Sequence, residues 1–162
     1  MFMEEKETEG SKDLQDSLKG YKEKVPIINK GVITWERDQV FTARIRGYQF
    51  EYDTKATEGC FPTDTLLMSL PGCLGIDIVS FLQKMRVEIK SFEIETTGER
   101  NPVPPQYYKS INMVIRISGN GITPKKLDRV ISLSQKKYCS VYHSLRKDID
   151  VKVSYVIEEN VL

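Results

Sequence analysis

Cysteine chemistry gives the first indication of what this 162-residue chain does. Cys73 lies in the apolar stretch LLMSLPGCLGIDIVSF, just after Pro71 and Gly72. Proline lacks an N–H group and its ring clashes with the preceding turn, so we expect the helix to kink or restart there. A restart would place free N–H groups and the positive end of a helix dipole beside Cys73, which favours its thiolate. The alternative interpretation is an ordinary buried cysteine beside a tolerated kink.

The other two cysteines lie in different surroundings. Cys139 stands in KKYCSVYHSL, so each of the two main helical stretches carries one cysteine. Cys60 precedes Pro62 in a loop, and we interpret it as structural or incidental. An odd number of widely spaced cysteines argues against a secreted disulfide scaffold, and in a reducing compartment such residues are inert core residues or reactive thiols.

Two further titratable residues lie close to these cysteines in the sequence. His143 follows Cys139 by one helical turn, a spacing that also suits a metal site or a Cys–His nucleophile pair. A zinc site needs three or four such ligands and the others are absent, so we expect no metal and place His143 on a helix surface. Asp77 shares a helical face with Cys73; it would raise the thiol pKa if it pointed inward, but we favour a structural hydrogen bond.

The elements that must position these residues follow from hydrophobic periodicity. Residues 63–86 carry apolar side chains around most of a helix circumference, which predicts a buried helix. A second helix should begin at Thr123 as the cap with Pro124 in its first turn, and should reach Cys139. Its inward positions are Leu127, Val130, Ile131 and Ser134.

Alternating patterns predict the strands. They are GVITWER, two runs within QVFTARIRGYQFEYD, KSFEIETTGER, YYKSINMVIRISG and DIDVKVSYVIEE. In the first sheet, Phe41, Ala43 and Ile45 should share one face, and Arg37-Asp38-Gln39 should form a hairpin turn. The order β-β-β-α-β-β-α-β describes an α+β domain. Tyr107 and Tyr108 follow the proline-rich loop NPVPPQ, and they either line a site or pack in the core.

Composition limits the remaining possibilities. The net charge is +1, and nucleic-acid-binding motifs are missing, so we expect no nucleic-acid partner. The longest apolar run is too short for a bilayer, and the acidic N-terminus lacks a signal-peptide core, so we expect a cytoplasmic protein without membrane contact. Residues 1–24 predict a charged flexible tail with a short helix around Leu14 and Leu18, and residues 25–162 a single domain.

A family resemblance rests on several motifs together. The segments FPTDTLLMSLPGCLGIDIVSFLQKMR, TGER, YYKSI and VISLSQKKYCSVYHSL resemble the OsmC/Ohr family of peroxide-reducing proteins, and most closely its YhfA-like branch. The match covers about residues 30–158. It implies an OsmC-like fold, with two central helices flanked by antiparallel sheets. It also implies an interwoven homodimer with active sites at the subunit interface.

The resemblance also implies an activity and its residues. The family reduces organic hydroperoxides to alcohols without a cofactor, and an external dithiol, which the family suggests is of lipoyl type, regenerates the enzyme. Cys73 matches the peroxidatic cysteine, which forms a sulfenic acid, and Cys139 the resolving cysteine of the resulting disulfide. Arg37 matches the arginine of the first hairpin turn, whereas Arg44 and Arg46 have the pattern of an outer strand face. Asp64 stands where the family has a longer glutamate, and would orient that arginine.

Departures from the family pattern keep other functions open. Asp64 is shorter than the family glutamate, and Pro71 replaces a common glycine. One alternative is a non-peroxidase dithiol redox or sensor protein, and another is a structural or binding dimer with the same fold. For the peroxidase, the apolar neighbours of Cys73 would favour a hydrophobic hydroperoxide. These neighbours are Leu70, Leu74, Ile76 and Phe81.

Overall fold

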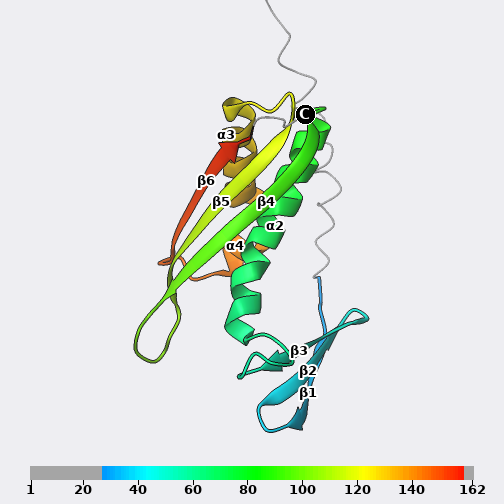
Figure 1. The fold of residues 1–162 in the computed structure, drawn as a ribbon, viewed down its shortest axis with the longest axis vertical. Coiled ribbons are helices and arrows are strands. Elements are labelled where there is room, and N and C mark those ends of the chain that lie inside the picture. Colours follow the sequence, from blue (N-terminus) through cyan, green and yellow to red (C-terminus); the bar gives the residue numbers. More distant parts are fainter. Residues whose placement is uncertain (1–26, 159–162) are drawn as a thin grey trace, which may run out of the picture.

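A computed structural model describes residues 27–158 and shows a mixed α+β fold (Figure 1). The elements are β1 (Gly31–Arg37), β2 (Val40–Ile45), β3 (Tyr48–Asp53), α2 (Pro62–Lys84), β4 (Glu88–Arg100), β5 (Tyr108–Asn120), α3 (Pro124–Leu133), the π-helix η2 (Ser134–Tyr138), α4 (Ser140–Ser144) and β6 (Asp150–Ile157). The predicted order of strands and main helices is confirmed. The predicted tail over residues 1–24, with its helix near Leu14 and Leu18, lies outside the described residues.

The first three strands form a small antiparallel sheet in the order β1-β2-β3. Its first turn lies at Asp38 and Gln39, as predicted, and Asp38 has the positive φ that such a tight turn demands. The side chains of Val40 and Thr42 are the most buried in β2, and those of Phe41 and Ala43 on the other face are partly exposed. This sheet stands beside the N-terminal end of α2 and apart from the second sheet (Figure 1).

The second sheet has the order β4-β5-β6 and carries the core. Strands β4 and β5 pair antiparallel over most of their length, whereas β6 lies parallel to β5. A parallel pair needs a crossover connection, and α3, η2 and α4 provide it. The crossover therefore brings Cys139, which follows η2, back over the same sheet face that α2 covers.

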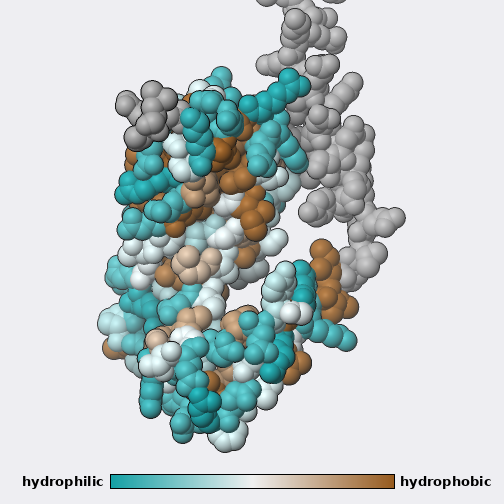
Figure 2. All heavy atoms as spheres, turned by 45° about the vertical axis from the view of Figure 1, so that its right-hand side comes forward, coloured by the Kyte–Doolittle hydropathy of each residue, from teal (hydrophilic) through white to brown (hydrophobic). Residues whose placement is uncertain are grey.

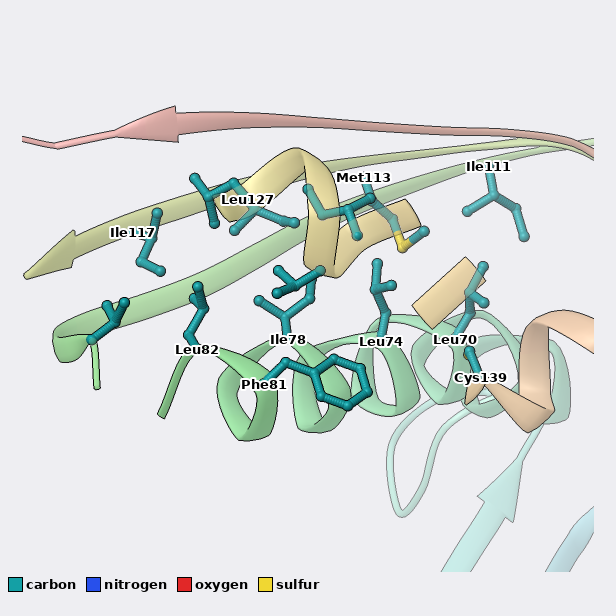
Figure 3. Packing of buried hydrophobic residues seen from close by; sticks show 14 of the residues in the cluster. Leu70, Leu74, Ile78, Phe81, Leu82, Ile111, Met113, Ile117, Leu127 and Cys139 are labelled. Carbon is teal, nitrogen blue, oxygen red and sulfur yellow. The ribbon is translucent and has the colours of Figure 1, made fainter. Parts of the chain in front are cut away.

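The core fills the space between this sheet and the helices (Figure 3). Alternate residues of β5 point inward, and they meet one stripe of α2 and the inward face of α3. The central side chains are at most 2% exposed: Leu70, Leu74, Ile78, Leu82, Ile111, Met113, Ile115, Ile117, Leu127 and Val130. Cys139 belongs to the same cluster, so one of the candidate reactive thiols is part of the hydrophobic core.

Helix α2 runs without interruption from Pro62 to Lys84, with Pro71 inside it. The predicted restart at Pro71 is therefore wrong. Packing against the sheet compensates for the one hydrogen bond that proline removes, because tertiary contacts contribute more to helix stability than a single bond. By length and composition α2 could also cross a membrane, contrary to the expectation from apolar runs, although core helices pass the same test. Its buried stripe identifies it as the core helix here.

The second helical stretch begins as predicted and ends differently. The side chain of Thr123 accepts a hydrogen bond from the N–H of Lys126 at 3.3 Å, and Pro124 follows the cap. After Leu133 the helix widens into η2, which ends at Tyr138 and has Cys139 as its C-cap. Single turns of π-helix occur frequently at functional sites, so the position of this one directs attention to Cys139.

Candidate active site

The fold brings Cys73 and Cys139 together. Cys73 lies in the middle of α2 and is partly buried, whereas Cys139 is completely buried. The two thiols are close enough for the Cys73 side chain to raise the pKa of Cys139. Cys139 also caps α4, where its sulfur accepts a hydrogen bond from the N–H of Tyr142 at 3.4 Å. Two neighbouring thiols, one of them accessible from the surface, can do dithiol chemistry.

Electrostatics keep Cys139 protonated. Its pKa rises to about 12, mainly because burial disfavours the thiolate. The side chain of Cys73 and the charge of Asp77 raise the pKa further, while the Tyr142 N–H lowers it. The two cysteines therefore differ. Cys139 stays a thiol at neutral pH and is a weak nucleophile, whereas Cys73 is the cysteine that solvent can reach.

Cys73 lies at the margin between the buried and open faces of α2. Leu70 and Leu74 on its inner side are 1% exposed and belong to the core, while Ile76 on the outer side is 73% exposed. Of the apolar neighbours predicted to receive a substrate, only Ile76 is therefore open, because Leu70, Leu74 and Phe81 are core residues. Since the helix does not restart, the backbone beside Cys73 has no free helix N-terminus.

An apolar groove of about 590 Å³ follows the outer face of α2 and the adjoining part of β4. Gly75 in this groove packs closely against Phe92 and Ile94. A Cβ added to Gly75 would lie 3.3 Å from the Phe92 ring. Figure 2 shows hydrophobic side chains reaching the surface on this side of the molecule. Its other lining residues are Met68, Pro71, Gly72, Ile76, Val79, Ser80 and Gln83.

Arg37 does not pair with Asp64 within the chain. Its guanidinium forms an ion pair with Glu58, whose carboxylate raises the pKa of Arg37 above the ordinary value. Asp64 instead accepts a hydrogen bond from the N–H of Phe61 at 3.3 Å and closes the first turn of α2. The roles assigned to Arg37 and Asp64 stay predictions. Glu58 was not predicted as the partner of Arg37, because the loop between β3 and α2 brings the two residues together only in the folded chain.

The loop that carries Glu58 is held by a buried carboxylate. Asp53 is 3% exposed and accepts hydrogen bonds from the N–H groups of Lys55, Thr57 and Glu58, and from the Thr57 hydroxyl. These bonds, led by the one from Lys55, hold the pKa of Asp53 well below its ordinary value. The carboxylate therefore fixes the backbone from which the Glu58 side chain reaches Arg37.

Asp77 makes the structural hydrogen bond that the sequence favoured. One of its oxygens accepts a hydrogen bond from the Ser134 hydroxyl at 2.6 Å. Ser134 was predicted on the inner face of its helix but its bond to Asp77 was not predicted, although a polar residue at an inward helical position was the available signal. His143 is exposed, as expected.

Two other sequence expectations concern Tyr108 and Cys60. Tyr108 is buried and donates its hydroxyl hydrogen to the carbonyl of Thr63 at 3.0 Å, so core packing describes it better than a site mouth. Tyr107 is more open and stacks against the Arg146 guanidinium. Cys60 pairs with β3 through backbone hydrogen bonds to Glu51 and from Asp53, which agrees with a structural role.

Comparisons with known proteins show which sequences and structures this chain resembles. The family described as OsmC-like protein matches residues 55–154. Protein YhfA of Escherichia coli (strain K12) is 34% identical over 96 residues, which cover 59% of this chain and 72% of YhfA.

Solved structures share the fold. A hypothetical protein from Aquifex aeolicus VF5 has a TM-score of 0.77 at 24% identity, covering 83% of this chain and 99% of that one. The organic hydroperoxide resistance protein OhrB of Bacillus subtilis has a TM-score of 0.56 at 14% identity, covering 80% and 98%. At these identities the structures support the fold alone.

Proposed function

This chain belongs to the OsmC-like family, and from that premise we propose that it is a thiol-dependent peroxidase that reduces organic hydroperoxides to alcohols. The observation that carries the proposal is the proximity of Cys73 and Cys139, which the fold brings together at the margin of the core. The name of the Bacillus relative supplies the substrate class. Cys60, the third cysteine of the described residues, is partly buried and pairs with β3 through its backbone.

The reaction proceeds in three balanced steps. The Cys73 thiolate attacks the distal peroxide oxygen; an S–O bond forms, the O–O bond breaks, and the alkoxide leaves and takes a proton to become the alcohol. Cys73 is then a sulfenic acid. Cys139 attacks that sulfur, the S–S bond forms, and water leaves. An external dithiol, for which a lipoyl group is suited, reduces the disulfide and is itself oxidised.

A second subunit completes the site in this proposal. The first sheet and the outer face of α2 leave large apolar side chains open, among them Trp35 at 63% exposure and Ile76 at 73%. Exposed apolar surface of this kind marks an interface, so we propose a homodimer in which each first sheet covers the partner's α2. Arg37, at the turn of that sheet, then reaches Cys73 across the interface and stabilises the thiolate and the departing oxygen.

Two observations favour a second candidate, a dithiol redox or sensor protein with slow peroxide turnover. Within the chain Arg37 is engaged by Glu58, and the continuous helix offers Cys73 no free N-terminus. A thiol without either form of stabilisation would exchange with disulfides but would react slowly with peroxides. The two candidates therefore differ in the oxidant that Cys73 prefers.

Single-turnover kinetics with cumene hydroperoxide test the proposal. We expect Cys73→Ser to abolish reduction, Cys60→Ser to leave it unchanged as the matched control, and Arg37→Ala to slow it by about 10²-fold, the scale of losing one strong charge stabiliser. Full activity in Cys73→Ser would refute the assignment of the nucleophile. Oxidation by disulfides but not by the hydroperoxide would favour the second candidate.

A further inference from the structure

A buried polar link joins the two cysteine-bearing segments. Ser134 is completely buried, and its hydroxyl donates to the carboxylate of Asp77 at 2.6 Å. Asp77 lies on α2 one turn after Cys73. A hydrogen bond to a carboxylate is stronger than one between neutral groups, and a buried hydroxyl that lost its acceptor would be costly. The bond therefore ties the start of η2 to α2 close to Cys73.

The same serine also holds Cys139 through its main chain. The carbonyl of Ser134 accepts the N–H of Cys139 at 2.9 Å, which is the hydrogen bond that closes the π turn. Ser134 thus binds the backbone of Cys139 through its carbonyl and binds Asp77 of α2 through its hydroxyl. An α-helical turn in place of η2 would present residue 139 at another angle around the helix, because it closes with one residue fewer.

An electrostatic role for Asp77 has the wrong sign for catalysis. Its charge disfavours the Cys139 thiolate, which is the form that must attack. Asp77 also already accepts the Ser134 hydrogen bond. What the carboxylate contributes to the pair is therefore its geometry.

We propose that Asp77 and Ser134 are positioning residues that hold Cys139 in register with Cys73 for disulfide formation. This inference rests on the redox pairing of the two cysteines in the proposed function, but not on the identity of the oxidant. In the step concerned, the Cys139 sulfur attacks the oxidised Cys73 sulfur. The S–S bond forms, and the group bound to Cys73 leaves with the electron pair of the broken bond. Residues that fix the approach of one sulfur to the other change the rate of this step alone.

The test uses an aromatic disulfide in place of a peroxide. In a full-length Cys60→Ser background, dithiobis(nitrobenzoate) reacts with Cys73 and releases one thionitrobenzoate. Cys139 then displaces the second thionitrobenzoate from Cys73, and absorbance reports the two phases separately. Cys139→Ser, which lacks the second phase, identifies it. Because no hydroperoxide is used, a protein without peroxidase activity would still give a result.

We expect Ser134→Ala and Asp77→Ala to slow the second phase about tenfold or more, the scale of a lost hydrogen bond to a charged group, and to leave the first phase unchanged. Asp77→Asn is the matched control: it keeps an oxygen acceptor for Ser134 but removes the charge that disfavours the Cys139 thiolate, so the second phase should run at the parent rate or faster. Parent rates in both alanine variants would overturn the inference. Equal slowing of both phases would do so too, because it would indicate general loosening of the fold.

Discussion

Attack of Cys139 on oxidised Cys73, which forms the disulfide, should become faster as the pH rises and should continue to do so well above pH 7. The pKa of Cys139 is about 12 because the thiol is buried, so about one molecule in 10⁵ carries the Cys139 thiolate at pH 7. This fraction rises about tenfold with each pH unit until the pKa is reached. If attack requires the thiolate, disulfide formation should become faster throughout the range from pH 7 to pH 10, by up to about tenfold per pH unit. Oxidation of Cys73 removes its charge from the pair, but burial, the largest cause, remains.

The assay is a single turnover in the Cys60→Ser background. Reduced protein is mixed with one equivalent of cumene hydroperoxide, quenched at intervals with an alkylating agent in acid, and its sulfenic acid and disulfide forms are separated by mass. The sulfenic acid should accumulate at pH 7 and should be short-lived at pH 10. A disulfide-forming rate that levels off below pH 9 would refute the reasoning, because it would mean that the attacking thiol ionises as an exposed cysteine does.

Two further predictions concern the scaffold around the site. Gly98→Ala should destabilise the fold by about 1–3 kcal/mol in urea unfolding, since the added Cβ would lie 2.5 Å from the ring of Tyr108, which its hydrogen bond to Thr63 holds in place; unchanged stability would contradict this packing. Asp53→Ala should loosen the loop at 54–59 and speed alkylation of Cys60 while leaving Cys139 protected. Because the pKa of Asp53 is depressed, its stabilising effect should be present above about pH 4 and lost on acidification. Equal rates of Cys60 alkylation in the wild type and in Asp53→Ala at neutral pH would argue against this role of Asp53.

Local patterns were sufficient to predict most of the fold. Alternation along β5 and the cap formed by Thr123 and Pro124 act through neighbouring residues, so these elements agree with expectation. Pro71 shows where local reasoning fails: it weakens an isolated helix, but the sheet packed against α2 holds that helix continuous. The first sheet shows another limit of local patterns. The alternation of Phe41, Ala43 and Ile45 indicates that these side chains share a face, but not whether another part of the protein covers that face.

The sequence was sufficient to identify the cysteines of the candidate site. It was not sufficient to predict the ion pair and hydrogen bond around them. Two cysteine motifs at the family spacing identified Cys73 and Cys139, and the fold brings them together. The partner of Arg37 could not be predicted, because Glu58 reaches it only through a loop that Asp53 folds. The link from Ser134 to Asp77 was equally hidden, since it depends on the crossover that lays η2 beside α2.

The most direct test of the central claim is a map of the disulfides formed by one equivalent of organic hydroperoxide. Reduced full-length protein is treated with cumene hydroperoxide, free thiols are blocked, and the peptides are identified by mass spectrometry. We expect a bond between Cys73 and Cys139, one alcohol released per chain, and a free thiol at Cys60. Free thiols at both Cys73 and Cys139 with the hydroperoxide unconsumed would contradict the claim.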